Sequence, residues 1–346
     1  MEYKWKLKNT EFTKDKGKVF SCFSCGGGST MGYKLAGFDV IGCNEIDKKM
    51  MDVYKINHNP KYSYLEGIQT FKDKKELPKE LYDLDILDGS PPCSSFSMSG
   101  NRGKDWGKEK KFKEGQSSQV LDTLFFDFID LSKRLQPKFV IAENVKGILM
   151  GDAKKYCSEI YNSFDKAGYY LDKWLLDSSI MGVPQKRERV FFIAIRKDLS
   201  NKLERGMDLF NNMPKLNLIF NKKEILFNEV QETTNKRKKL LNSYLKHWEN
   251  TDKNGRSKET KNKKTFGFFY KAMKNKVLKT IIAGGAYAIE ENPLLLTKKE
   301  LCLCGSFPLD YNFNGVDPQY LIGMSVPPLM IKNIAIEISN QWLSKL

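Results

Sequence analysis

Short apolar runs and longer amphipathic stretches alternate along the first half of the chain. Residues 18–23 read as a buried strand, and three glycines at 26–28 turn it into a helix that ends near Gly37. Residues 38–45 then read as a second strand that ends in an acid, Glu45. This strand, glycine turn, helix, strand order predicts a βαβ unit with a ligand-binding turn.

The same alternation continues to about residue 195. The pattern predicts strands at 84–88, 139–142 and 190–195, and helices at 120–135 and 156–167. Strands that alternate with helices of this length form a mostly parallel sheet with helices on both faces. We therefore predict an α/β fold with a doubly wound, mostly parallel sheet of the Rossmann-like type.

The regular pattern stops after about residue 197. Residues 200–278 are rich in Lys, Asn and Thr with interleaved aromatic residues, and regular signals return at 279–282. An apolar helix is predicted from Pro328 to about Leu343, since proline is tolerated in a first helical turn. These boundaries predict a catalytic domain of residues 1–197 and 279–346 and a smaller domain of residues 198–278.

Charge points to a polyanionic partner. The 346 residues carry a formal net charge of +16, and residues 231–280 hold 15 Lys or Arg against 4 Asp or Glu. Nucleic acid gains from counterion release on such a surface, although lysine on ordinary solvated faces is the alternative explanation. No apolar run approaches the roughly 20 residues that cross a bilayer, and the N-terminus has no apolar signal core. We expect a cytoplasmic protein that does not enter a membrane.

Cysteine and histidine give little support to metal chemistry. The seven cysteines are scattered and odd in number, which argues against a disulfide framework. The pairs Cys22/Cys25 and Cys302/Cys304 would supply four thiolates for zinc, the weaker of two explanations for them. His58 and His247 are the two histidines and belong to no recognisable constellation. We predict no metal site.

Two motifs directly follow predicted strands. The first is typical of a cofactor-binding turn, and the second offers a candidate nucleophile. The turn at 23–29 brings backbone close to a nucleotide-like ligand, and Glu45 is placed to accept hydrogen bonds from ribose hydroxyls. These features alone do not distinguish NAD, FAD and S-adenosylmethionine, and a tight structural turn is the alternative. In Asp88-Gly-Ser-Pro-Pro-Cys-Ser-Ser-Phe-Ser97, two prolines precede Cys93 at the carboxyl edge of the sheet. A buried structural cysteine is the alternative there.

Two further motifs supply a carboxylate and two arginines. Glu143 in Glu143-Asn-Val145 again lies just past a strand, where a buried carboxylate is costly unless it is paired or used. Arg187 and Arg189 in Gln185-Lys-Arg-Glu-Arg189 share one face if the segment is extended. Structural ion pairs are the alternative for both motifs.

The four motifs together suit one reaction, methylation of cytosine at carbon 5. A thiolate that adds to carbon 6 makes carbon 5 enamine-like, and a carboxyl group at N3 stabilises the added charge. An arginine at O2 assists the same polarisation. A base inside a duplex is inaccessible, so the target cytosine must be flipped out.

The ordered blocks resemble the bacterial and phage DNA cytosine-5 methyltransferase family. Residues 23–32 are similar to its opening glycine block, 44–47 to its ribose block, 91–97 to its nucleophile block, 143–145 to its acid block, 185–189 to its arginine block, and 296–308 and 323–328 to its two closing blocks. Each block is weak alone, whereas all of them in this order are specific.

This resemblance implies a DNA (cytosine-5) methyltransferase with S-adenosylmethionine as cofactor and duplex DNA as partner. Cys93 would be the nucleophile, Glu143 would contact N3 and the amino group, and Arg189 would contact O2 with support from Arg187. The implied cofactor site comprises Phe23, Gly26, Gly27, Glu45, Ile46, Gly67, Ile68, Pro92, Leu124, Ser325 and Val326. Residues 94–115 would be the loop that closes over DNA, and residues 198–278 the target-recognition domain.

The chain departs from the family pattern at several positions near these blocks. Cys25 replaces a glycine, Ser94 a glutamine and Met324 an asparagine, and no aspartate stands near Gly67 to read the adenine amine. The alternatives to DNA methylation are methylation of cytosine in tRNA and a catalytically silent DNA-binding homologue. The family implies protection of DNA in a restriction–modification system, with a cognate endonuclease as a partner, and we expect a monomer. The sequence does not encode a readable DNA target site.

Overall fold

The computed structural model describes residues 2–92, 109–110, 119–120, 123–150, 153–204, 213–251 and 269–346. By packing, the chain divides into two units. The sheet unit comprises Glu11–Leu176, Glu188–Ile219 and Ile331–Leu346, and the smaller unit comprises Met1–Thr10, Asp177–Arg187 and Phe220–Met330. This division differs from the predicted domain boundaries, because residues 198–219 belong to the sheet unit and residues 279–330 to the smaller unit.

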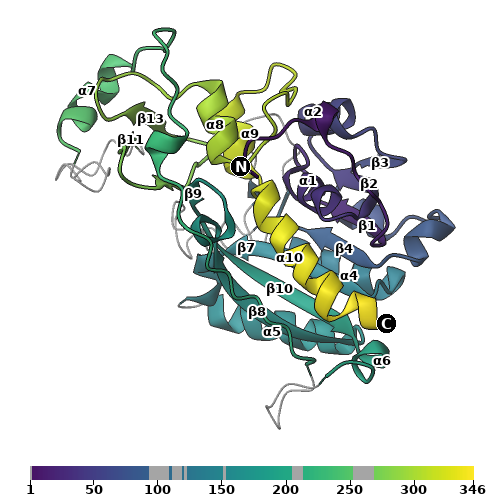
Figure 1. The fold of residues 1–346 in the computed structure, drawn as a ribbon. Coiled ribbons are helices and arrows are strands. Elements are labelled where there is room, and N and C mark those ends of the chain that lie inside the picture. Colours follow the sequence, from purple (N-terminus) through teal and green to yellow (C-terminus); the bar gives the residue numbers. More distant parts are fainter. Residues whose placement is uncertain are drawn as a thin grey trace. The chain divides into compact units, whose positions relative to one another are not determined.

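The sheet unit is built on seven strands in the order β3-β2-β1-β4-β7-β10-β8 (Figure 1). Its elements are β1 (Lys18–Cys22), α1 (Gly28–Leu35), β2 (Asp39–Glu45), α2 (Lys48–His58), β3 (Tyr62–Leu65), α3 (Ile68–Lys72), β4 (Ile86–Gly89), α4 (Leu124–Leu135), β7 (Phe139–Val145), α5 (Ala153–Lys166), β8 (Tyr169–Asp177), β10 (Glu188–Arg196) and α6 (Lys197–Ser200). The pairs β3/β2, β2/β1, β1/β4 and β4/β7 are parallel, and β10 is antiparallel to β7. The predicted α/β fold with a mostly parallel sheet is confirmed.

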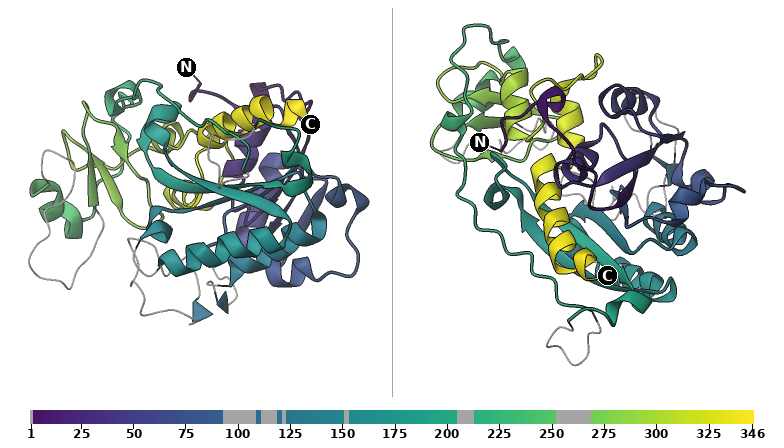
Figure 2. Two further views of the ribbon diagram at one scale, coloured as in Figure 1. Left: turned by 90° about the horizontal axis from the view of Figure 1, so that it is seen from below. Right: turned by 45° about the vertical axis from the view of Figure 1, so that its right-hand side comes forward.

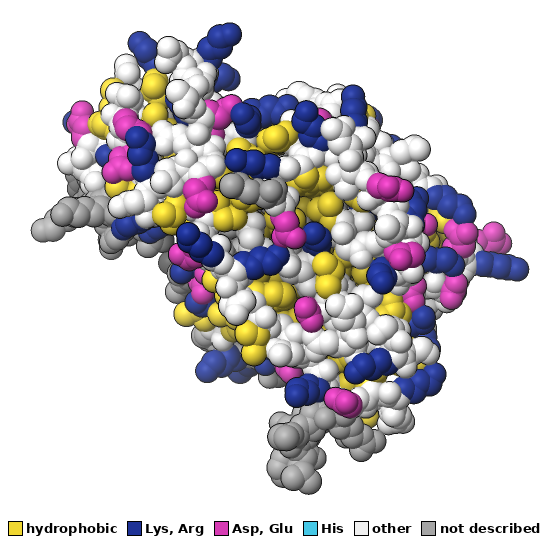
Figure 3. Space-filling model, in the orientation of Figure 1, with side chains coloured by type: hydrophobic (Ala, Val, Ile, Leu, Met, Phe, Trp, Pro, Cys, Tyr) yellow, Lys and Arg dark blue, Asp and Glu magenta, His cyan; other side chains and the backbone are white. Residues whose placement is uncertain are grey.

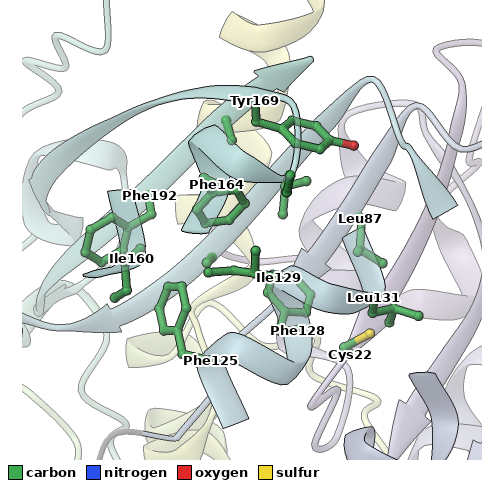
Figure 4. Packing of buried hydrophobic residues seen from close by; sticks show 14 of the residues in the cluster. Cys22, Leu87, Phe125, Phe128, Ile129, Leu131, Ile160, Phe164, Tyr169 and Phe192 are labelled. Carbon is green, nitrogen blue, oxygen red and sulfur yellow. The ribbon is translucent and has the colours of Figure 1, made fainter. Parts of the chain in front are cut away.

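Helices cover both faces of this sheet. Helices α4 and α5 pack with Phe125, Phe128, Ile160 and Phe164 against Phe192 of β10, in an extended apolar cluster of the sheet unit (Figure 4). The C-terminal helix α10 (Pro328–Gln341) lies on the opposite face, as the left view of Figure 2 shows in yellow. There Trp342 stacks on Phe139 of β7 with ring centroids 5.6 Å apart.

Several predicted element bounds were wrong. The helix expected from residue 120 begins at Leu124, and Val120 pairs with Glu109 in a two-stranded ribbon of β5 (Glu109–Lys110) and β6 (Gln119–Val120). Strands β3 and β8 were not predicted. β3 has no buried position, and in β8 buried positions are interrupted by polar and exposed ones, so neither segment shows the continuous apolar run of a strand that is buried on both faces.

The smaller unit holds short strands, three short helices and the start of α10. Its elements are β9 (Gln185–Lys186), α7 (Asn242–Glu249), β11 (Phe269–Ala272), β12 (Leu278–Lys279), β13 (Ala286–Ile289), α8 (Lys298–Cys304) and α9 (Pro318–Met324). Strands β11 and β13 pair in parallel, as do β12 and β9. Leu240, Phe269, Ala286 and Ala288 form a local core against which Tyr244 and Trp248 of α7 pack.

The helical stretch Pro318–Lys345 is long and apolar enough to cross a membrane by length and composition. No such stretch was expected from the sequence. Its most apolar window is 72% buried inside the structure. Burial of this kind is typical of a core helix in a soluble protein, because a spanning helix presents its apolar side chains to lipid.

A buried ion pair fastens the segment before α7 to α8. Arg237 donates to both carboxylate oxygens of Glu300 at 2.6 Å, and the two side chains are 2% and 0% exposed. Glu300 also accepts hydrogen bonds from the backbone N–H groups of Glu232 and Thr297, both at 2.8 Å. The Glu300 carboxylate therefore accepts four hydrogen bonds, and Arg237 supplies the positive charge that balances it.

An Arg237→Met substitution is expected to lower the free energy of unfolding by about 3–5 kcal/mol, because it leaves the Glu300 charge buried without its partner. Urea denaturation measures this loss. Lys222→Met is the control, since it breaks an exposed pair with Glu2 (2.8 Å) and should cost only about 0–1 kcal/mol. The double variant Arg237→Met/Glu300→Leu should regain part of the lost stability, because it removes the buried charge but also removes the acceptor of the Glu232 and Thr297 N–H groups. Equal losses for Arg237→Met and Lys222→Met would contradict this account.

Candidate active site

Five strand ends lie in one row at the carboxyl edge of the parallel sheet. In register, Cys22 pairs with Asn44 and Gly89, Asn44 pairs with Tyr64, and Gly89 pairs with Ala142. Most of the predicted site residues follow these positions within a few residues: Phe23, Gly26, Gly27, Glu45, Ile46, Gly67, Ile68, Pro92 and Glu143. Ligands of open α/β sheets bind at this edge, so the fold brings these residues to one place.

The turn after β1 is tightly constrained. Phe23 (φ 52°), Cys25 (φ 47°) and Gly27 (φ 85°) all have left-handed backbone conformations. A Cβ atom at Gly27 would lie 2.2 Å from Nε2 of His58, so only glycine fits. At Cys25 the left-handed conformation favours glycine, which gives a physical reason for the glycine that the family usually has there.

His58 of α2 supports this turn from behind. Its Nε2 lies 3.3 Å from the carbonyl oxygen of Gly26, and the side chain is buried. Burial, with the nearby Lys34 charge, lowers the pKa of His58 to about 3, so the ring is neutral at physiological pH. Sequence reasoning missed this contact, because the partners lie 32 positions apart in the chain.

Glu45 connects the end of β2 to the glycine turn. Its Oε2 accepts the N–H of Cys25 at 2.7 Å, and its Oε1 accepts the N–H of Asp47 at 2.9 Å. Burial raises the pKa of Glu45, and these backbone donors oppose the rise. Each carboxylate oxygen keeps a further lone pair, so Glu45 can still accept hydrogen bonds from the hydroxyls of a ribose.

Ile46 and Gly67 are neighbours at the next strand ends. A Cβ atom at Gly67 would lie 3.6 Å from Cδ1 of Ile46. The side-chain nitrogen of Asn44 donates to the carbonyls of Tyr64 and Glu66 and so joins the loops after β2 and β3. Glu66 is engaged with Lys74 at 3.0 Å. Ile46 and Gly67 are partly exposed, so this part of the edge offers aliphatic and backbone surface, whereas the Ile68 side chain is buried.

Phe23 directly follows the end of β1, and Leu124 lies at the start of α4. Phe23 makes an edge-to-face contact with Phe128, with ring centroids 6.3 Å apart. Leu124 is the first residue of α4 and is fully buried. Both side chains belong to the apolar wall of this edge.

Glu143 and Arg189 form an ion pair on neighbouring strands. Arg189 Nε lies 2.8 Å from Glu143 Oε1, and the side chains are 15% and 12% exposed. The antiparallel register of β10 and β7 sets this geometry, because Arg189 lies opposite Val145 and Phe191 opposite Glu143. Glu143 and Arg189 thus form the structural ion pair that was the alternative for each of them. The same arrangement also lets a carboxylate and a guanidinium face one ligand.

Arg187 has different partners from Arg189. It is 3% exposed and donates to the carbonyls of Ile281 at 2.9 Å and Gly323 at 3.0 Å, all within the smaller unit. Gln185 reinforces the same link, since it donates to Cys304 O and accepts from Ile281 N. These contacts fix the segment that leads to Ser325 and Val326, which are both 4% exposed.

The predicted nucleophile Cys93 and the loop that follows it lie outside the described residues, apart from the backbone of residues 109–110. Pro92 is the last described residue before them. Asn144, which was not singled out from the sequence, donates to the carbonyl of Pro91 at 3.2 Å and is 3% exposed. The residue beside Glu143 therefore holds the backbone that leads to Cys93.

Asp88 is a second residue that sequence reasoning missed as a part of the site. It is 2% exposed at the end of β4 and accepts hydrogen bonds from the hydroxyls of Ser21 (2.8 Å) and Tyr33 (3.1 Å). Burial raises the pKa of Asp88 to about 7 despite these donors, and the nearby Glu143 charge contributes to the rise. A lone carboxylate at the end of an apolar strand is the sequence signal that identifies such a group.

The raised pKa of Asp88 predicts a pH-dependent stability. An unfolded aspartate titrates near about 3.9, so the stability that the buried neutral form contributes is complete below that pH. It is lost as the pH rises through about 7. We expect the free energy of unfolding of the wild type to fall by a few kcal/mol between about pH 4 and 7 relative to Asp88→Asn. Urea denaturation of both proteins across this range measures it, and parallel profiles would refute it.

The fold and this edge define an α/β protein whose glycine turn, buried acids and Glu143–Arg189 pair lie at one end of a mostly parallel sheet. Residues 17–340 match the model of the C-5 cytosine-specific DNA methylase family. The chain belongs to that family. Proteins of this family use S-adenosylmethionine.

Similar proteins carry names of the same kind. Type II methyltransferase M.FnuDI of Fusobacterium nucleatum is 38% identical over 185 residues, which are 53% of this chain and 48% of that protein. Type II methyltransferase M1.HphI of Haemophilus parahaemolyticus is 28% identical over 90% of this chain and 84% of its own length. A crystal structure of a Spodoptera frugiperda DNMT2 mutant shares the fold, with a TM-score of 0.64 at 18% identity over 92% of this chain and 98% of that one. The alignments span about half or less of the first curated relatives.

Proposed function

We propose that this protein is a DNA (cytosine-5) methyltransferase that acts on a flipped-out cytosine within a short, specific site of duplex DNA. One observation supports this more than any other. In a member of the C-5 cytosine-specific DNA methylase family, a carboxylate and a guanidinium lie 2.8 Å apart at the sheet edge that also carries the glycine turn. This pair suits the N3 and O2 atoms of a cytosine ring.

S-adenosylmethionine fits the residues at this edge. The left-handed turn at 23–27 places its backbone at the end of β1, beside Glu45, which has lone pairs for the ribose hydroxyls. Ile46 offers an aliphatic surface for adenine, and Gly67 and Ile68 offer backbone. We assign Phe23, Gly26, Pro92, Leu124, Ser325 and Val326 to the same site. When bound, this cofactor supplies an electrophilic methyl group.

The protein residues activate the cytosine. The Cys93 thiolate adds to carbon 6, and the electron pair of the C5–C6 double bond becomes available at carbon 5. Glu143 hydrogen-bonds at N3 and Arg189 at O2, so both stabilise charge that develops on the ring. After methylation, a water molecule or hydroxide from solvent takes the carbon 5 proton, and the electron pair left behind restores the double bond as the Cys93 thiolate departs. Arg187 positions backbone and does not contact the base.

We assign DNA recognition to residues 198–278. The excess of basic residues at 231–280 suits phosphate contact. On the visible face of the molecule, Lys and Arg are spread among Asp and Glu (Figure 3). In the local core of the smaller unit, Lys271 lies 4.1 Å from the ring centroid of Trp248, and the indole N–H of Trp248 donates to Ile289. This core gives a rigid base for side chains that contact DNA.

We further propose that the protein is monomeric and cytoplasmic and protects DNA from an endonuclease of the same specificity. Relatives named type II methyltransferases support this role. This protective role requires that every copy of the target sequence in the host DNA is methylated.

Bisulfite sequencing of plasmid DNA from cells that express the chain tests the activity. Methylated cytosines at one short recurring sequence are the expected result, and they also reveal the target. Unmethylated DNA from cells with soluble protein would refute the proposal. In that case purified tRNA and duplex DNA should be compared as methyl acceptors, and calorimetry with S-adenosylmethionine would identify a silent homologue.

A further inference from the structure

The segment that precedes the family match is fastened to the smaller unit at several points. Residues 2–10 lie before the matched residues 17–340. Trp5 donates its indole N–H to the carbonyl of Ser306 at 3.0 Å, and its own carbonyl accepts the N–H of Leu309 at 2.9 Å. The Asp310 carboxylate accepts the N–H groups of Leu7 (2.7 Å) and Lys8 (3.1 Å).

Ser306 links this segment to the closing block. It is fully buried in a left-handed conformation (φ 54°), which is unfavourable for a residue with a Cβ atom. Its hydroxyl accepts the N–H of Leu329 at 3.2 Å. Leu329 lies in the first turn of α10, where backbone N–H groups have no partner within the helix. The side chain of Ser306 thus fixes the start of α10, directly after Ser325 and Val326.

We propose that residues 2–10 position the closing cofactor block, residues 323–328, and that Trp5 is the positioning residue through which they act. This inference rests on the proposed function, since it assigns Ser325 and Val326 to the S-adenosylmethionine site. The Trp5 hydrogen bond holds the Ser306 carbonyl and so maintains the strained backbone that aims the Ser306 hydroxyl at Leu329. Arg187 holds the same block from its other side through Gly323.

Trp5→Phe keeps an aromatic ring and removes the N–H donor. We expect the Kd and KM for S-adenosylmethionine to rise on the order of three- to tenfold, the range for one lost hydrogen bond. The kcat at saturating cofactor should change by less than about twofold, because the groups that contact cytosine are unchanged. A general loss of folded protein would instead lower the apparent kcat and leave Kd unchanged.

Two further variants sharpen the test, which uses the full chain, calorimetry with S-adenosylmethionine and steady-state kinetics on methylatable plasmid. Lys6→Ala is the matched control in the same segment and should bind cofactor like the wild type. Ser306→Ala should weaken binding in the same direction. The Kd of the double variant Trp5→Phe/Ser306→Ala for S-adenosylmethionine should lie within about twofold of the Kd of Ser306→Ala, since both changes act on the same chain of contacts.

The outcomes separate the two proposals. If the wild type binds S-adenosylmethionine and Trp5→Phe binds it with the same Kd, the positioning role is overturned and the proposed function stands. Fully additive effects on Kd in the double variant would have the same meaning. A wild-type protein that neither binds S-adenosylmethionine nor methylates DNA would overturn the proposed function and this inference with it.

Discussion

Cys93→Ser is expected to abolish methyl transfer while DNA binding stays within about threefold of the wild type. A serine hydroxyl is almost completely protonated at neutral pH and is a much weaker nucleophile than a thiolate, so addition to carbon 6 should fail. Loss of such a nucleophile costs on the order of 1000-fold or more in kcat. Bisulfite sequencing and transfer of a labelled methyl group measure the activity, and a gel mobility shift measures DNA binding.

A second cysteine provides the control for this experiment. Cys157 lies on α5 in the apolar cluster between the helices and the sheet and is 9% exposed. Cys157→Ser makes the same chemical change away from the strand ends and should leave methylation within about twofold. Methylation that persists in Cys93→Ser would remove the covalent mechanism, and an equal loss in both variants would mean that folding had failed.

Glu143→Gln is expected to lower kcat by about 100- to 1000-fold with little change in the Kd for cofactor or DNA. Glutamine has nearly the same shape and can still accept a hydrogen bond from Arg189 Nε, so the 2.8 Å contact geometry should survive. What is lost is an acidic proton at N3, which a protonated carboxyl group transfers to the ring nitrogen as the thiolate adds and which an amide does not supply. Single-turnover kinetics with saturating DNA isolate this step.

Glu188 supplies the matched control for Glu143. It precedes Arg189 on β10, pairs with Lys146 at 3.1 Å, and is 41% exposed. Glu188→Gln should therefore change kcat by less than about twofold. If Glu143→Gln kept half of the activity, or if both variants lost it equally, the assigned role of Glu143 would be rejected.

The regular part of the fold was predictable because each prediction depended on local pattern. Strands that are buried on both faces appear as continuous apolar runs, so β1, β2, β4, β7 and β10 were predicted near their actual positions. Strands β3 and β8 were missed, because half-exposed strands share their composition with loops. The antiparallel direction of β10 depends on pairing with a strand more than 40 residues earlier, which no local pattern encodes.

The candidate site shows the same distinction between motifs and contacts. Glycines that precede helices, acids that follow strands and a cysteine after two prolines are visible in the sequence, since parallel strand ends meet at one edge. The different partners of Arg187 and Arg189 were not visible. Two residues at alternate positions suggest one shared face, whereas Arg187 binds backbone carbonyls and Arg189 binds Glu143.

The α/β class, the order of the motifs and the family could be inferred from residue types at fixed spacing. The packed fold was needed to show that His58 supports the glycine turn, that Asp88 is buried with a raised pKa, and that Trp5 reaches Ser306. Each of these depends on burial and on contacts between residues 32 to 301 positions apart or on separate strands. Chain distance hides such contacts, and only the packed fold determines the solvation and hydrogen bonds that set their energies.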